Sequence, residues 1–142
     1  LKKNPVFLYS SDRFQKPYPF EADIAVDVGP VFEKKVDALM ALVSQTFEGG
    51  ALSSAEQTAL APPESQPDLR EQWLEEKWVR RAAGEAKKYR AALVKWYGKK
   101  GETVQHAEGF EICEYGRRPG EQEILRLFVR QIQSKHFLQP LL

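Results

Sequence analysis

The segment ADIAVDVGPVFEKKVDALMALVSQ, from Ala22 to Gln45, decides the fold of this chain. Its first part, Ile24 to Val28, is short and rich in β-branched residues, which predicts a strand. Gly29-Pro30 breaks the strand, and proline suits the first turn of a helix, where an N–H group is not needed. Apolar residues then recur at helical spacing at Phe32, Val36, Leu39, Met40, Val43 and Phe47. A strand that leads into a helix predicts an α/β fold.

Two further strands are expected on either side of this segment. The apolar run from Val6 to Tyr9 predicts a buried strand beside residues 24–28. Residues 106–115 alternate imperfectly between apolar and charged side chains, which predicts a strand that ends at Gly116. The loop between the first two strands holds Asp12, Arg13 and Lys16. Because α/β folds place binding sites on loops beyond strand ends, this loop is a candidate binding site. Alternatively, its aromatic residues cap the edge of the core, and Arg13 and Lys16 are only solvated.

Helices are expected in the middle and at the end of the chain. Ser53 or Ser54, followed by Glu56 or Gln57, predicts a capping box for a short helix. The longest helix is expected over residues 68–97, with Asp68 as N-cap and Gly98 after its end. A last helix is expected over residues 121–133. The buried stripe of the long helix comprises Leu69, Trp73, Trp78, Ala82, Ala86, Tyr89, Leu93 and Trp96.

The second half of the long helix is basic. Between Lys77 and Lys100 there are nine lysines and arginines and one acid, Glu85. Such a face is typical of a solvated surface, or of a surface that contacts an anionic partner. The anion-binding candidates are Arg80, Arg81, Lys87 and Lys88.

Composition indicates one soluble globular domain. The 142 residues are 42% hydrophobic and 29% charged, with a net charge of +1, so nucleic acid is not the expected partner. The single cysteine, Cys113, excludes an internal disulfide. No apolar run is long enough to span a membrane. The chain opens at Leu1 without an initiator methionine, so a preceding segment is expected, and the compartment stays open.

A search for catalytic motifs finds no catalytic residue and no metal ligand set. The two histidines lie thirty residues apart, without the spacing of a zinc site. No serine lies in a nucleophile elbow, and no glycine-rich loop follows a strand. His106 and Glu108, two positions apart at the start of a strand, would project to one face and orient a substrate, or form a surface feature.

Several segments together resemble the C-terminal part of the LmbE-like (PIG-L) N-deacetylases. They are Asp12 to Pro17, Ala22 to Asp27, Phe32 to Gln45, and Ala107 to Glu111 with the run to Gly116. The resemblance spans residues 6 to about 128. It implies a Rossmann-like layered α/β domain over residues 1–142, with a tail at 129–142 that matches nothing in the family.

The resemblance also implies zinc-dependent hydrolysis of an N-acetyl group on a sugar or glycoconjugate. In that family a metal polarises the amide carbonyl and activates water. Its ligands lie in an Ala-His-Pro-Asp-Asp motif and a later histidine motif, and neither occurs here. Leu42 stands where relatives often carry a histidine. The expectation is therefore a portion of a deacetylase that holds no zinc and is inactive by itself.

Three interpretations follow. The first is this incomplete deacetylase, whose Asp12, Arg13, Lys16, His106 and Glu108 contact substrate or another subunit. The second is a non-catalytic binding or structural module whose basic helix, residues 77–100, contacts an anionic partner. The third is an inactive remnant that forms homo-oligomers through a sheet edge or through the apolar tail.

Overall fold

The computed structural model describes residues 4–11, 15–16, 18–50 and 52–129. It contains both helices and strands, which confirms the mixed α/β class. The contacts divide the chain into two compact units. Unit 1 holds the residues up to Gly29 and those from Ala82 onward, and unit 2 holds Pro30–Arg81. The helix α4 (Pro67–Lys88) contributes residues to both units.

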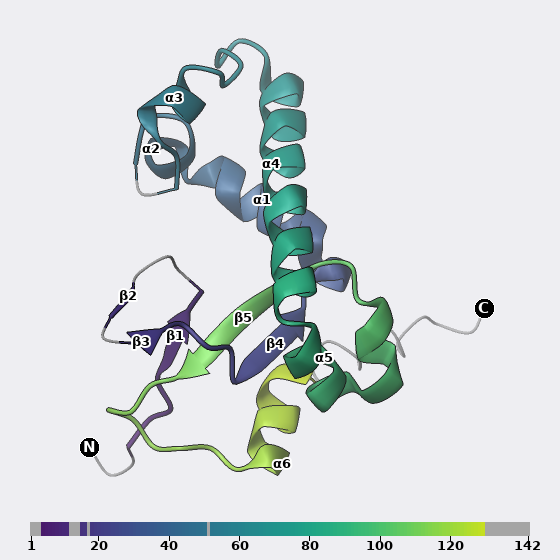
Figure 1. The fold of residues 1–142 in the computed structure, drawn as a ribbon. Helices are drawn as coiled ribbons and strands as arrows, with labels where there is room; N and C mark the ends of the chain where they lie inside the picture. Colours follow the sequence, from purple (N-terminus) through teal and green to yellow (C-terminus); the bar gives the residue numbers. More distant parts are fainter. Residues whose placement is uncertain (1–3, 12–14, 17, 51, 130–142) are drawn as a thin grey trace, which may run out of the picture. The chain divides into compact units, whose positions relative to one another are not determined.

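Unit 1 is built on an antiparallel sheet of three strands in the order β1-β5-β4 (Figure 1). These are β1 (Leu8–Ser10), β5 (Ala107–Ile112) and β4 (Ile24–Asp27). Because β5 lies between the other two, the prediction that the first strand lies beside residues 24–28 is wrong. A separate short pair joins β2 (Gln15–Lys16) to β3 (Tyr18–Pro19).

The first strand is an exposed edge strand, which corrects the prediction of a buried one. Phe7 is 50% exposed and Tyr9 is 40% exposed. Strand β1 pairs with β5 alone, with Tyr9 opposite Glu111. The Tyr9 hydroxyl donates to Glu114 at 3.2 Å, and its hydrogen bond with the buried Cys113 raises the pKa of Tyr9. The apolar run from Val6 to Tyr9 thus contributes to a strand that pairs with a neighbour along one edge only.

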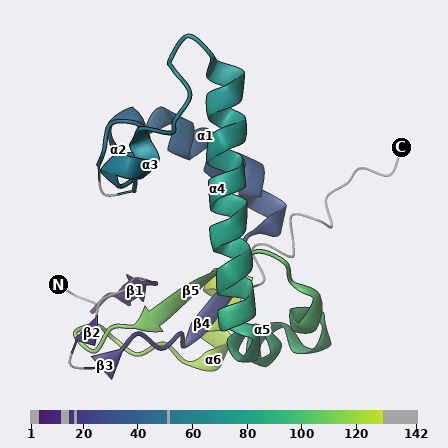
Figure 2. The same ribbon diagram turned by 45° about the horizontal axis from the view of Figure 1, so that its top comes forward.

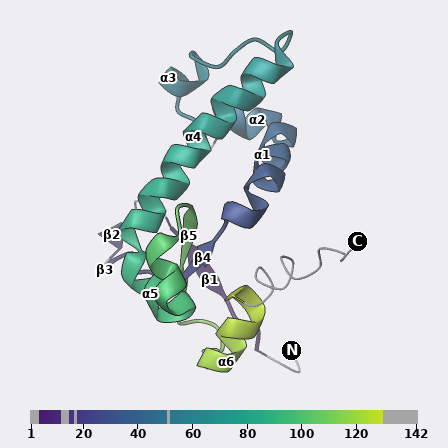
Figure 3. The same ribbon diagram turned by 90° about the vertical axis from the view of Figure 1, so that its right-hand side faces the viewer.

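Helices cover both faces of the sheet. Ala25 and Ala107 pack on one face with Ala86, Tyr89 and Leu93. Side chains of a strand alternate between faces, so Ile24 and Val26 point to the other side, where they pack with Ile124 of α6 (Glu121–Ile124). Figure 3 shows α5 and α6 on different sides of the sheet. The core of unit 1 therefore has two layers of side chains around the strands.

The outer edge of β4 is covered by α5 (Arg90–Tyr97) (Figure 2). The indole N–H of Trp96 donates to the Asp23 carbonyl at 2.8 Å. The Asp27 N–H donates to the Tyr97 hydroxyl at 3.0 Å, and burial raises the pKa of Tyr97. Because the outward backbone groups of an edge strand invite pairing with another chain, these two aromatic residues protect this edge. Among the described residues, β1 pairs with no strand on its other side.

The long basic helix is interrupted at Tyr89. Helix α4 ends at Lys88, α5 begins at Arg90, and Tyr89 between them has a φ of −103° and a ψ of 28°. The start also differs, because Pro67 is the first helical residue and Asp68 lies in the first turn. Proline is favoured at that position. The predicted helix over 68–97 is therefore two helices.

The buried stripe of α4 differs from the predicted one at its beginning. Leu69 is 50% exposed, whereas Leu74, which the prediction omitted, is fully buried. Leu74, Trp78, Ala82 and Ala86 follow one another at intervals of four, so they share a helix face. The predicted stripe moved from Trp73 to Trp78, a step of five, because it omitted Leu74.

Unit 2 begins with a broken helix. The turn η1 (Gly29–Val31) leads into α1 (Phe32–Ala41), and α2 (Val43–Thr46) follows after a break at Leu42. Leu42 is 48% exposed. The Thr46 hydroxyl, which is buried, donates to the Leu42 carbonyl at 2.8 Å. The same carbonyl also accepts from the backbone N–H groups of Gln45 and Thr46, each at 3.0 Å. The helix predicted over residues 32–45 is thus present in two pieces.

The short helix of unit 2 confirms the predicted capping box. Helix α3 (Ala55–Thr58) is capped by Ser54, whose hydroxyl accepts from the Gln57 N–H at 3.3 Å. The Gln57 side chain accepts from the Ser54 N–H at 3.4 Å in return. Of the two pairs that the sequence allowed, Ser54 and Gln57 form the box, while Ser53 is buried.

A buried polar network involving Ser53 holds α2 against α4. The ammonium group of Lys77 donates to the Leu52 carbonyl at 3.0 Å and to the Ser53 hydroxyl at 2.7 Å. That hydroxyl donates to the Thr46 carbonyl at 2.7 Å. Burial lowers the pKa of Lys77, and the charge of Arg81 lowers it further. Lys77 therefore has a structural role, because its ammonium group is bound to the segment before α3.

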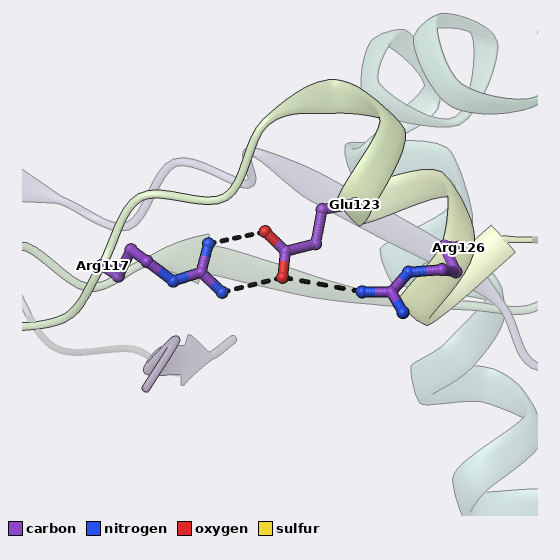
Figure 4. Close-up of polar contacts among 3 residues, drawn as sticks. All are labelled: Arg117, Glu123 and Arg126. Atoms are coloured by element: carbon purple, nitrogen blue, oxygen red, sulfur yellow. Dashed lines mark hydrogen bonds and ion pairs between the residues drawn. The ribbon is translucent and has the colours of Figure 1, made fainter. Parts of the chain in front are cut away.

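The described chain ends in a short α-helix that continues as a π-helical turn. The turn η2 (Gly98–Thr103) precedes β5, and α6 continues as the π-helical turn η3 (Leu125–Val129). Ile124 is buried, whereas Leu127 is 38% exposed. Arg117 forms two hydrogen bonds with Glu123, at 2.6 and 2.7 Å, and Arg126 approaches the same carboxylate (Figure 4). The tail from residue 130 lies outside the described residues.

The ion pair between Arg117 and Glu123 predicts a pH-dependent contribution to stability. Its hydrogen bonds lower the pKa of Glu123, so its contribution is complete above the ordinary carboxyl pKa and disappears as the pH falls through the lowered value. Glu123→Gln should reduce the free energy of unfolding at neutral pH and leave it unchanged at a pH of about 2. Urea denaturation at both pH values measures this, with Glu121→Gln as the control. An equal loss at both pH values would contradict the assignment.

Candidate functional site

A cluster of polar side chains surrounds the end of β1 in unit 1. The Ser11 N–H donates to the Gly109 carbonyl at 3.1 Å. In a continued antiparallel ladder the Gly109 N–H would donate back to the Ser11 carbonyl. It donates instead to the Glu85 carboxylate at 3.0 Å. The Ser11 and Tyr89 hydroxyls are 2.9 Å apart, so residues from three distant segments meet here.

The Glu85 carboxylate accepts the Gly109 N–H that a strand carbonyl would otherwise accept. Its removal should therefore lower the free energy of unfolding. Glu85→Ala leaves the Gly109 N–H without that acceptor, which should lower the free energy of unfolding by about 1–3 kcal/mol. Glu85→Gln retains a carbonyl oxygen and should lose about half as much or less. Urea denaturation of the two variants measures the difference. Equal losses in both would show that charge, and not this hydrogen bond, is what matters.

The sequence did not identify this cluster as a unit. Ser11 and Tyr89 are 78 positions apart in the chain, so no spacing pattern connects them. One signal was present, because Glu85 is the only acid within the basic run of residues 77–100. An isolated acid in a basic helix often pairs locally; here its carboxylate also accepts a backbone N–H. The hydroxyl and carboxylate groups position a strand end and are suited to hydrogen-bonding polar ligands.

Two of the predicted loop residues follow Ser11 of this cluster in the chain. Asp12 and Arg13 follow Ser11 directly in the chain, but they lie outside the described residues. Lys16 belongs to β2 and is paired with Tyr18. The loop therefore leaves the sheet at Ser11, close to Tyr89 and Glu85.

His106 and Glu108 occupy the start of β5. The His106 carbonyl accepts from the Val28 N–H at 3.0 Å, and Glu108 is opposite Val26. Gly109 faces the ring of Tyr89, so Glu108, one position earlier, points to the other face of the sheet. Both side chains are half-buried, and each takes part in an interaction. Glu108 is thus not directed toward the Ser11 cluster.

The four anion-binding candidates are exposed on α4. Arg80, Arg81, Lys87 and Lys88 all have exposed side chains. Two of them also lie over aromatic rings, with the Arg81 guanidinium 5.0 Å from the Trp78 ring centroid and the Lys88 ammonium 5.0 Å from that of Tyr89. Such contacts add modest stability at an exposed site. These cations therefore cover aromatic residues while remaining accessible to solvent.

Among the described residues, no group of three or more histidine, cysteine, aspartate and glutamate side chains is arranged to hold a metal ion. No helix in the described part of the chain is long and apolar enough to cross a membrane. Comparison of the chain with protein-family models, with curated proteins and with solved structures finds no match in any of the three.

Proposed function

We propose that this chain is the C-terminal portion of a LmbE-like N-deacetylase, which hydrolyses an N-acetyl group on a sugar or glycoconjugate. One observation supports the proposal above the others. The segments that carry the resemblance, 22–27 and 107–111, are about eighty residues apart in the chain, and they pair in one sheet as β4 and β5. Segments that a family shares are expected to meet in space, because they form its common scaffold.

The Rossmann-like layering is part of this proposal. Strand β5 is antiparallel to both of its neighbours, whereas a Rossmann-like sheet is mostly parallel. The proposal therefore assigns the parallel strands to another segment of the complete protein. The sheet of unit 1 then extends that layered core.

The zinc site is assigned to that other segment as well. The described residues do not fit a zinc ion, because they offer no ligand cluster and zinc requires three or four nitrogen, sulfur or oxygen ligands. Leu42, at the position of a family histidine, carries an apolar side chain at the break between α1 and α2. This chain would then contribute residues that contact the substrate or another subunit, and no catalytic step is assigned to it.

The test compares this chain with the product of the longer reading frame. The proposal expects an in-frame Ala-His-Pro-Asp-Asp motif upstream of Leu1. The longer protein with zinc should release acetate from an N-acetylglucosamine-containing glycoconjugate, and the 142-residue chain with zinc should not. A longer protein without the motif and without acetate release would reject the proposed family. Acetate release by the short chain would reject the proposed incompleteness.

The alternative function is contact with an anionic partner through the basic helix. It is favoured by the exposure of all four candidates, Arg80, Arg81, Lys87 and Lys88. Binding to vesicles that contain an anionic lipid should then weaken as salt increases and disappear when all four are replaced by glutamate. Reversal of Lys34 and Arg118, which are exposed and lie outside residues 77–100, is the control. Equal loss in the control would indicate a general charge effect.

Homo-oligomerisation remains a proposal for the outer edge of β1, which pairs with no second strand among the described residues. Trp96 and Tyr97 cover the edge of β4, so strand addition is expected at β1, where Leu8 and Ser10 direct their backbone groups outward. The apolar tail, which was the other expected contact, lies outside the described residues.

A further inference from the structure

Strand β1 of unit 1 has an outer edge that pairs with no second strand among the described residues. It lies on the side of β5 away from β4 and α5 (Figure 2). The backbone groups of Phe7 and Ser11 bond to β5, and in an antiparallel pair only every second residue faces its neighbour. Those of Leu8 and Ser10 therefore point outward. Such an edge can accept a strand from another chain.

On this edge, Tyr9 lies next to two negatively charged side chains. Glu111 is opposite Tyr9 in the ladder, so the two side chains are neighbours on one face of the sheet. The Tyr9 hydroxyl donates to Glu114 at 3.2 Å, and Glu111 accepts from the backbone N–H of Glu21 at 3.2 Å. Both donors are neutral, and no lysine, arginine or histidine in the described part of the chain forms an ion pair with either carboxylate. Hydrogen bonding therefore leaves the charge of both carboxylates in place.

Two exposed aromatic rings accompany these carboxylates. Phe7 is two positions before Tyr9, so both side chains project from the same face of β1. Phe7 is 50% exposed and Tyr9 is 40% exposed. An exposed ring attracts a cation to its negative face, and a cation next to the Tyr9 ring would also be attracted to Glu111 and Glu114. This face of the edge therefore fits a lysine or arginine side chain.

The other face of the same edge is apolar. Leu8 packs with Phe110 and Ile112 against a buried cluster that includes Ile24 and Ile124. A strand added beside β1 would alternate its side chains between the two faces. Its basic side chains would lie on the face of Tyr9, and its apolar side chains would lie on the face of Leu8. The edge is thus complementary to an extended segment in which basic and apolar residues alternate.

We propose that the outer edge of β1 binds an extended peptide segment of another protein, in which lysine or arginine residues alternate with apolar residues. The peptide backbone pairs with Leu8 and Ser10, and a basic side chain lies beside Tyr9 and is attracted to Glu111. A second copy of this chain fits less well, because its own β1 (Leu8–Ser10) brings no cation to this face. The interaction is independent of the proposed deacetylase activity.

The test adds synthetic peptides to the whole chain. The probe is a short peptide with blocked ends in which lysine and valine alternate, and its control has the same composition with the lysines and the valines in separate blocks. Hydrogen exchange of the Leu8 and Ser10 amides, followed by NMR, should slow about tenfold at a probe concentration of about ten times the Kd. The control peptide should bind more weakly. Unchanged exchange at both amides, or equal affinity for the two peptides, would overturn the proposal.

Variants of the carboxylates identify the charges that select the peptide. Glu111→Gln and Glu114→Gln should each weaken binding of the alternating peptide about two- to fivefold, the range of an exposed ion pair. Glu102→Gln removes an exposed acid of the turn before β5 and should leave the Kd unchanged. Fluorescence anisotropy of the labelled peptide measures these Kd values. An equal Kd for the native chain, Glu111→Gln and Glu114→Gln would overturn the proposed site.

Ser10→Pro tests the backbone pairing. Proline removes the outward N–H of Ser10 and is tolerated on an edge strand, so this variant should lose peptide binding, whereas Ser10→Thr should retain it. Peptide binding that persists in Ser10→Pro would contradict strand addition. A dimer in analytical ultracentrifugation that Ser10→Pro dissociates, and that the alternating peptide does not, would assign the edge to a second copy and overturn the proposal. If Ser10→Pro does not fold, the comparison of Glu111→Gln and Glu114→Gln with Glu102→Gln still decides the question.

Discussion

Replacement of Gly109 by alanine is expected to lower the free energy of unfolding by about 3 kcal/mol, the upper range for overpacking a core. A Cβ atom at this position would lie 2.5 Å from Cε2 and 2.7 Å from Cδ2 of Tyr89. The ring cannot easily move away, because its hydroxyl is 2.9 Å from that of Ser11 and Phe20 packs against its edge. The strain would therefore spread through the Ser11 cluster.

Urea denaturation measures this effect, and Gly84→Ala is the matched control. A Cβ atom on Gly84 would meet nothing within 4 Å, and alanine stabilises a helix by about 0.5–1 kcal/mol relative to glycine. Tyr89→Leu in the Gly109→Ala background should recover part of the loss, because it removes the conflicting ring. Equal denaturation midpoints for Gly109→Ala and the native chain would contradict the packing of Tyr89 on β5.

Replacement of Leu93 by alanine is expected to cost about 2–5 kcal/mol. Leu93 of α5 is fully buried and packs with Ala25 of β4 and Ala107 of β5. Those small neighbours have little side chain with which to fill the cavity. The loss should therefore lie toward the upper end of this range.

Val94→Ala is the control for Leu93→Ala. Val94 is the next residue of α5, and its side chain is 37% exposed. Its truncation should change the free energy of unfolding by about 0.5 kcal/mol or less, since alanine also has the higher helix propensity. Urea denaturation of both variants locates the buried face of α5. Similar losses at both positions would show that α5 is not packed as described.

Local chemistry made several elements predictable. The strand over residues 24–27, the break at Gly29-Pro30 and the box between Ser54 and Gln57 depend on residues only a few positions apart. The terminal strand was also predictable, because Ala107 to Ile112 alternates and is followed by a turn. Such features follow from backbone preferences and from hydrogen bonds within one turn.

The candidate site was predictable only in part. His106 and Glu108 are close in the chain, so their location at the start of one strand could be expected. The meeting of Ser11, Glu85 and Tyr89 could not, because it depends on which strand pairs with β1. Strand order has no local signal, since any apolar strand can pair with any other.

The breaks in the helices likewise depend on tertiary contacts. The apolar pattern continues through Leu42 and Tyr89 without a proline or glycine, so the sequence predicts unbroken helices there. In the structure the ring of Tyr89 packs against Gly109, and the buried Thr46 hydroxyl donates to the Leu39 and Leu42 carbonyls on the two sides of the break. Propensity is a weak preference of under about 1 kcal/mol per residue, and packing overrides it.

The sequence by itself determined that this chain is a mixed α/β protein, where its main strand and capped helix begin, and that a cationic run surrounds one acid. The tertiary structure alone decided that β5 lies between β1 and β4, and that the Glu85 carboxylate accepts the Gly109 N–H at the end of the ladder. The physical reason is range. Periodicity and capping act over a few residues, whereas pairing and polar satisfaction depend on groups brought together from distant segments of the chain.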